Sequence, residues 1–272
     1  MIKRTLSAFI AIALLFVLIW ADYASKLPLI NIALGIILVA ALFEIYKPFG
    51  FINRFFLGAV GFALGISVFV LYPSHAKDLG FIITFYLIVM FVLAVTYHRT
   101  VSFSDICILL FTTLYISMGM LHIRMLHDGK FGLAMVFVAL IAAFLTDTGA
   151  YFTGYFFGKH KLIPEISPKK TVEGAVGGVI TATLSMLVYA WILKFFGIKT
   201  NLLNIVITGA LTSVISQFGD LSASMIKRGL GIKDYGDIMP GHGGVLDRVD
   251  SLLFAAPVIY YLNMILPLLE EI

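Results

Sequence analysis

The chain has 272 residues, of which 61% are hydrophobic and 12% are charged, and its mean hydropathy is +1.03. Soluble domains are typically about 45–50% apolar and about 25% charged, so these values exclude an ordinary soluble protein and indicate an integral membrane protein. The formal net charge of +4 is mild, and the single cysteine, Cys107, excludes a disulfide framework within one chain.

The apolar runs predict an all-α, polytopic membrane protein with about nine transmembrane helices. A spanning helix needs about 20 mostly apolar residues. The first run is long enough to span, so we expect it to remain as an anchor and not to be cleaved as a signal peptide. The nine predicted spans lie near residues 5–21, 28–43, 55–72, 79–97, 103–122, 132–157, 174–196, 202–219 and 250–269.

Lysine and arginine in the connecting loops predict the orientation. With a cytoplasmic N-terminus and alternating spans, 13 of the 19 basic residues fall on the inside. Positively charged loops stay in the cytoplasm, so the N-terminus is expected there. Two long basic connections, 158–173 and 220–250, then face the cytoplasm. We expect scaffold helices in residues 1–131 and a catalytic region in residues 132–272.

The sixth run contains an acidic residue at membrane depth. Asp147, Tyr151, Gly154 and Gly158 are spaced to share one helical face. A carboxylate at the centre of a spanning helix costs about 2.5–3.5 kcal/mol on insertion scales, so it must face a partner, water or the helix end. Asp147 is therefore either functional or part of a structural hydrogen bond between helices.

The eighth run carries a polar stripe at steps of three and four residues. Its members are Ser213, Gln217, Asp220, Ser224 and Lys227. Such a stripe requires a water-filled cavity or a protein partner. A packing face would account for the serines. It does not account for Asp220 followed by adjacent cations.

The connection after the sixth run contains the sequence SPKKTVEG, residues 167–174. Thr171 is expected to cap a helix that starts near Val172, and a helix N-terminus directs free N–H groups at anions. Lys169 and Lys170 add positive charge, but the spacing of a P-loop is absent. The segment therefore predicts a phosphate-binding site of another kind.

The second basic connection mixes equal numbers of acidic and basic residues. From Lys227 it reads KRGLGIKDYGDIMPGHGGVLDRVDS, with four of each. Mg²⁺ prefers oxygen ligands, usually one or two carboxylates plus substrate phosphates, and Lys and Arg hold the remaining phosphate charge. This mixture predicts a metal–polyphosphate site. Asp247 or Asp250 could instead cap the last helix.

These motifs resemble a known family. The patterns Ser224-x-x-Lys227-Arg228-x-x-x-x-Lys233-Asp234 and Pro240-Gly241-His242-Gly243-Gly244-x-x-Asp247-Arg248-x-Asp250 are similar to the signature of phosphatidate cytidylyltransferases (CDP-diacylglycerol synthases). The blocks QFGDL (217–221), SPKKTVEG and Asp147-x-x-Ala150-Tyr151-x-x-Gly154 also resemble this family, so the motifs cover about residues 140–251.

The resemblance implies transfer of CMP from CTP to phosphatidate, with release of pyrophosphate. It implies dependence on Mg²⁺, K⁺ as a second ion, Asp220 and Asp247 as metal ligands, and a homodimer with its site open to the cytoplasm. The protein is then expected in the inner (plasma) membrane, with no nucleic-acid partner. The catalytic residues expected from the motifs are Asp220, Lys227, Arg228, Lys233, Asp234, His242, Asp247, Arg248 and Asp250. Those expected to bind substrate are Asp147, Tyr151, Ser167, Lys169, Lys170, Thr171, Glu173, Gln217, Ser224, Gly243 and Gly244.

Three other functions fit parts of the pattern. A secondary anion transporter would also use an intramembrane aspartate, although its site is expected near the midplane between repeats, and no repeat is evident here. A polyprenol or lipid kinase would transfer a terminal phosphoryl group. A structural membrane subunit needs none of these carboxylates. The role of His242 stays open between donating to a phosphate and structuring its loop.

Overall fold

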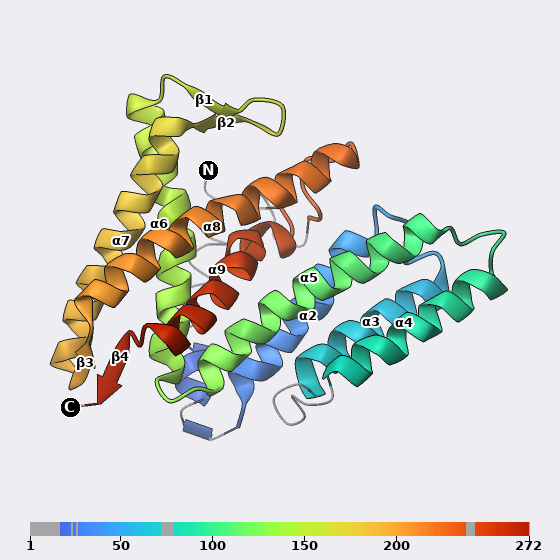
Figure 1. Ribbon diagram of the computed structural model, residues 1–272, viewed down its shortest axis with the longest axis horizontal. Helices are drawn as coiled ribbons and strands as arrows, with labels where there is room; N and C mark the ends of the chain where they lie inside the picture. Colours follow the sequence, from blue (N-terminus) through green and yellow to red (C-terminus); the bar gives the residue numbers. More distant parts are fainter. Residues whose placement is uncertain (1–16, 23, 26, 72–78, 238–242, 272) are drawn as a thin grey trace. The chain divides into compact units, whose positions relative to one another are not determined.

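The computed structural model describes residues 17–22, 24–25, 27–71, 79–237 and 243–271 (Figure 1). Its helices are α2 (Leu29–Tyr46), α3 (Phe55–Leu71), α4 (Leu79–Thr96), α5 (Phe103–Asp128), α6 (Gly132–Phe157), α7 (Val172–Phe195), α8 (Leu202–Gly229) and α9 (Leu246–Ile265). Each overlaps one of the predicted apolar runs. The predicted first span, 5–21, lies mostly outside the described residues.

Five of the described helices are long and apolar enough to cross a membrane: α2, α5, α6, α7 and α8. Residues Phe55–Leu71 and Gly80–Thr96 form shorter apolar helices. The protein is thus an all-α membrane protein, as expected from its composition. Nine spans and a cytoplasmic N-terminus remain predictions.

Two small sheets are exceptions to the all-α expectation. The connection after α6 forms an antiparallel hairpin of β1 (Lys161–Ile163) and β2 (Ser167–Thr171). A second antiparallel pair joins β3 (Ile198–Thr200), before α8, to β4 (Leu269–Glu271), after α9. The periodicity of short polar connections carries little strand signal, so neither pair was expected.

The polar end of the eighth run is helical. The apolar run was expected to end at residue 219, but α8 continues to Gly229. The polar residues continue at helical spacing, so one helix carries the whole stripe from Ser213 to Lys227. Residues 220–229, expected within a cytoplasmic connection, therefore belong to α8.

The chain forms two compact units. The first consists of residues 1–121 together with Asp234–Arg248, and the second consists of His122–Lys233 together with Val249–Ile272. In the first unit, α3 packs on α2 and α5: a Cβ added at Gly61 would lie 2.6 Å from the Tyr46 hydroxyl and 2.9 Å from a Leu109 methyl. Leu42, Leu64 and Ile116 are among the buried core residues of this unit.

In the second unit, α6 and α7 pack closely and α8 packs against both. A Cβ added at Gly177 would lie 2.2 Å from the Thr153 hydroxyl, and one at Gly178 would lie 2.8 Å from the Thr146 carbonyl. Small residues at these positions let helix backbones approach closely, which is a common way of packing helices in a membrane. The β1–β2 hairpin lies at one end of α7 and the β3–β4 pair at the other (Figure 1).

Candidate functional site

The first half of the α8 stripe makes contacts with neighbouring helices. The Ser213 hydroxyl lies 2.7 Å from the Thr146 hydroxyl of α6. The Gln217 amide donates to the Ala175 carbonyl of α7 at 3.2 Å. Ser213 and Gln217 therefore connect α8 to α6 and α7 by hydrogen bonds.

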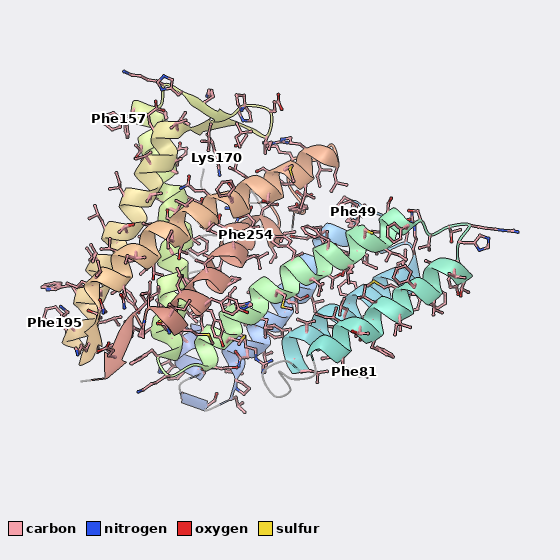
Figure 2. The ribbon with its side chains drawn as sticks, viewed as in Figure 1. Phe49, Phe81, Phe157, Lys170, Phe195 and Phe254 are labelled. Carbon is pink, nitrogen blue, oxygen red and sulfur yellow. The ribbon has the colours of Figure 1, made fainter. Side chains whose placement is uncertain are left out.

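The second half of the stripe is charged, and Asp220 is its central member. The Lys170 ammonium from β2 forms an ion pair with the Asp220 carboxylate. Each side chain is 25% exposed. Figure 2 shows Lys170 on the side of the hairpin that faces α8. The structure thus brings together two residues, 50 positions apart in the sequence, that were predicted to share a site.

Two further carboxylates and a second lysine gather near this ion pair. Asp250 is 6% exposed and its charge interacts with those of Asp220, Lys227 and Asp147. The Lys227 side chain is also buried, at 8% exposed. The Ser251 hydroxyl donates to the Asp147 carboxylate at 2.9 Å. Asp147 therefore has the interhelical hydrogen bond that was one of its two expected roles, and it lies close to the other charged groups.

Asp250 does not cap α9. The helix begins at Leu246, so Asp250 lies a full turn inside it. Its carbonyl packs against α8 at Gly219, where an added Cβ would lie only 2.9 Å away. Buried charges require compensating charges or hydrogen bonds, and here the compensation comes from Lys227 and from the Ser251 backbone N–H, which donates at 2.7 Å.

The β1–β2 hairpin presents the predicted phosphate-binding segment. Thr171 caps α7 as expected, because its hydroxyl accepts from the Gly174 N–H at 3.1 Å. Glu173 points back to the hairpin and accepts from the Lys159 N–H at 3.1 Å and from the His160 ring at 2.6 Å. The Glu173 side chain therefore links the first turn of α7 to the residues that precede the hairpin. Of the other predicted residues in this segment, Lys169 is exposed and Ser167 is half-buried.

Other predicted residues lie at the ends of these elements. Arg228, at the end of α8, donates to the Ile166 carbonyl of the hairpin at 3.4 Å and to the Ile232 carbonyl at 3.2 Å. Lys233 is exposed and Ser224 is half-buried. Tyr151 is 66% exposed and stacks on Tyr155 at a centroid distance of 6.4 Å.

The remaining predicted residues belong to the first unit. Asp247 Oδ2 accepts from the Tyr235 N–H at 2.9 Å and from the Gly244 N–H at 3.0 Å. Gly243 has φ +83°, a conformation that favours glycine, and an added Cβ would lie 3.2 Å from Asp247. Asp234 and Arg248 are exposed. His242 lies outside the described residues.

The two predicted metal ligands are both carboxylates. No group of three or more His, Cys, Asp or Glu side chains forms a ready metal site among the residues that the structure describes. Mg²⁺ commonly takes one or two protein carboxylates and completes its shell with substrate phosphates and water. Asp220 and Asp247 supply that type of donor. They belong to different units, so their sharing of one site stays a prediction.

Two residues that contact the predicted ones were missed by sequence reasoning. Ser251 binds Asp147, and Glu44 of α2 accepts hydrogen bonds from the segment that carries Asp247. Glu44 is an acidic residue at the end of an apolar run, and an ionisable residue in such a position indicates a functional or structural role. The sequence offered no indication of its partner.

Comparison with known proteins places the chain in a family. The sequence profile described as "Cytidylyltransferase family" matches residues 2–266. The chain belongs to the cytidylyltransferase family. Every candidate residue described above lies within the matched region.

Several curated relatives of this cytidylyltransferase-family chain are named phosphatidate cytidylyltransferase. The protein from Staphylococcus aureus (strain COL) is 36% identical over 203 residues, which cover 72% of this chain and 75% of the relative. The protein from Bacillus subtilis (strain 168) is 36% identical over 65% of each chain. The protein from Haemophilus influenzae is 44% identical over 53% of this chain and 51% of the relative. In these last two alignments, the chain spans less than two thirds of the relative's length.

Proposed function

We propose that this protein transfers CMP from CTP to phosphatidate and so produces CDP-diacylglycerol and pyrophosphate for phospholipid biosynthesis. A phosphate oxygen of phosphatidate forms a bond to the α-phosphorus of CTP. The bond between that phosphorus and the oxygen bridging to the β-phosphate breaks, and pyrophosphate leaves. The nucleophile is already an anion, so the reaction needs no strong general base.

One observation carries this proposal: the family match extends over residues 2–266 and includes every candidate charged residue. The names of the relatives supply the substrate pair. The cluster around Asp220 supports the same reaction class, because it combines carboxylates with Lys170 and Lys227.

The residues of the chain act through charge and position. Bringing two polyanions together is opposed by electrostatic repulsion, which fixed cations reduce. Lys170, Lys227 and Arg228 are assigned to the phosphates in the second unit, and Arg248 is assigned to them in the first. Gly243 allows the backbone to approach a phosphate closely, whereas the Gly244 N–H already donates to Asp247.

Magnesium is the proposed cofactor, with K⁺ as a second ion. Asp220 and Asp247 are its proposed ligands. When bound, the metal would neutralise phosphate charge and stabilise the charge that develops on the leaving pyrophosphate. The ion pair of Asp220 with Lys170 supports the proposal, because it shows that this carboxylate faces a positive charge.

The proposed reaction also requires a location. We assign nine spans, a cytoplasmic N-terminus and a site open to the cytoplasm of the inner membrane, because CTP is cytosolic and the lipid phosphate lies at the interface. Residues 1–131 would act as scaffold and residues 132–272 would carry the chemistry. A homodimer is part of the proposal and rests on family resemblance.

Purified protein in mixed micelles tests the reaction. With phosphatidate, CTP and Mg²⁺, CDP-diacylglycerol and pyrophosphate should form in equal amounts. Diacylglycerol, which lacks the phosphate, should give no product. Product from diacylglycerol with release of CDP would indicate a lipid kinase, and exchange of anions across a bilayer without CTP consumption would indicate a transporter.

A further inference from the structure

Glu44 is a buried carboxylate near the end of α2. Its side chain is 2% exposed. Its two oxygens accept from the Val245 N–H at 2.9 Å and from the Leu246 N–H at 2.8 Å. All three residues belong to the first unit. A side chain from one of the first helices thus binds the backbone where α9 begins, about 200 positions later in the chain.

The segment around α9's first turn closes tightly on this carboxylate. A Cβ added at Gly236 would lie 2.5 Å from Glu44 Oε1, and one added at Gly244 would lie 2.5 Å from Oε2. Neither distance is possible for real side chains, so the two glycines let the backbone approach from two sides. The Glu44 carboxylate therefore lies between Gly236 and the residues that lead into α9.

The same segment carries Asp247. Its carboxylate accepts from the N–H groups of Tyr235 and Gly244. Glu44 accepts from the N–H groups of Val245 and Leu246, the two residues that precede Asp247. Two carboxylates thus satisfy four backbone N–H groups of one short segment. The conformation that presents Asp247 and Arg248 is fixed by this network.

The buried Glu44 carboxylate requires hydrogen-bond donors of this kind. Removing a carboxylate from water costs several kcal/mol unless charge-assisted hydrogen bonds replace the water. The N-terminus of α9 offers free N–H groups and the positive end of the helix dipole. Both N–H groups are satisfied by an anion from a different element, so the helix start is held to α2.

We propose that Glu44 is a positioning residue for the cytidylyl transfer proposed above: it holds the backbone at the start of α9 so that Asp247 and Arg248 are presented to the nucleotide phosphates. Glu44 does not touch substrate in this account. It acts by fixing the backbone of the residues that do, and the inference rests on the proposed function.

Glu44→Gln tests the proposal in the full-length protein. The amide keeps the size of the side chain but replaces one acceptor oxygen with a donor that faces a backbone N–H. Amide hydrogen exchange at Val245 and Leu246 should become about tenfold faster. In the CTP and phosphatidate assay, kcat should fall about 100-fold while KM for phosphatidate stays within about threefold.

Asp105→Asn is the matched control. Asp105 is also an acid of the first unit that accepts a backbone N–H at the start of a helix, from Ser102 at 2.9 Å. Its replacement should lower the melting temperature slightly and leave kcat unchanged. A loss of activity in Glu44→Gln that only follows the loss of folded protein would contradict a positioning role.

Gly236→Ala tests the same contact from the opposite side, which keeps the proposal testable if Glu44→Gln does not fold. It should accelerate exchange at Val245 and Leu246 and lower kcat. Unchanged exchange in both variants would overturn the contact, and faster exchange with unchanged kcat would overturn the positioning role. Inactivity of the wild-type protein would count against the proposed function, and hydrogen exchange would still show whether Glu44 holds the segment.

Discussion

Charged side chains of β2, α8 and α9 lie close together and form the cluster to which we assign part of the chemistry. Asp220 pairs with Lys170, while Asp250 is buried beside Lys227. Together with Asp147, the cluster holds three carboxylates and two lysines, so its formal charge without substrate is slightly negative. Added phosphates would change that balance, and a divalent cation would restore it.

Asp220→Asn tests this reading of the cluster. The amide keeps the shape but cannot bind a cation as the carboxylate does, so Mg²⁺-dependent turnover should fall at least about 1,000-fold. Asp128→Asn is the control in the same unit, because Asp128 forms an exposed ion pair with Arg124. Turnover close to that of wild type in Asp220→Asn would remove Asp220 from the metal site.

Asp247→Asn should give the same loss of turnover as Asp220→Asn. Here the backbone N–H donors of Tyr235 and Gly244 face the replaced carboxylate, so folding must be measured separately by thermal melting. A folded Asp247→Asn protein with normal Mg²⁺ dependence would contradict the assignment of this residue as a metal ligand.

At the scale of elements, the hairpin and the helices on either side of it are held by close backbone contacts. A Cβ added at Gly154, Gly174 or Gly177 would lie less than 3 Å from an atom of a neighbouring residue. The Thr171 cap fixes where α7 begins. These contacts position Lys170 opposite Asp220.

Gly177→Ala tests this packing. The added methyl meets the Thr153 side chain of α6, so unfolding should become easier by about 1–3 kcal/mol and the melting temperature should fall. Gly229→Ala is the control, since an added Cβ there has nothing within 4 Å. Equal melting temperatures for both variants would show that α6 and α7 do not pack as described.

The helices were predictable from sequence, because apolar runs of the right length leave few alternatives in a membrane. The polar stripe of α8 and the Thr171 cap were also predictable, since both depend on local spacing. The pairing of Lys170 with Asp220 was not, because it depends on a hairpin with no strand periodicity. The contact of Glu44 with Val245 joins residues 201 positions apart, and no local pattern encodes such a contact.

In the whole molecule, the proposed function requires both basic connections on one side of the membrane. In a Cys107→Ser background, Lys161→Cys in the hairpin and Asp237→Cys after α8 should react with a membrane-impermeant thiol reagent from the cytoplasmic side. The replacement is needed because Cys107 is exposed. Lys199→Cys in β3 should react only from the opposite side. Labelling of the hairpin and of residue 237 from opposite sides would contradict the predicted topology.

Position-labelled CTP distinguishes transfer of a cytidylyl group from transfer of a terminal phosphoryl group. With phosphatidate and Mg²⁺, the α-phosphorus of CTP should appear in the lipid product and the γ-phosphorus in pyrophosphate. Transfer of the γ-phosphorus to lipid, or no transfer of either label by folded protein, would contradict the account.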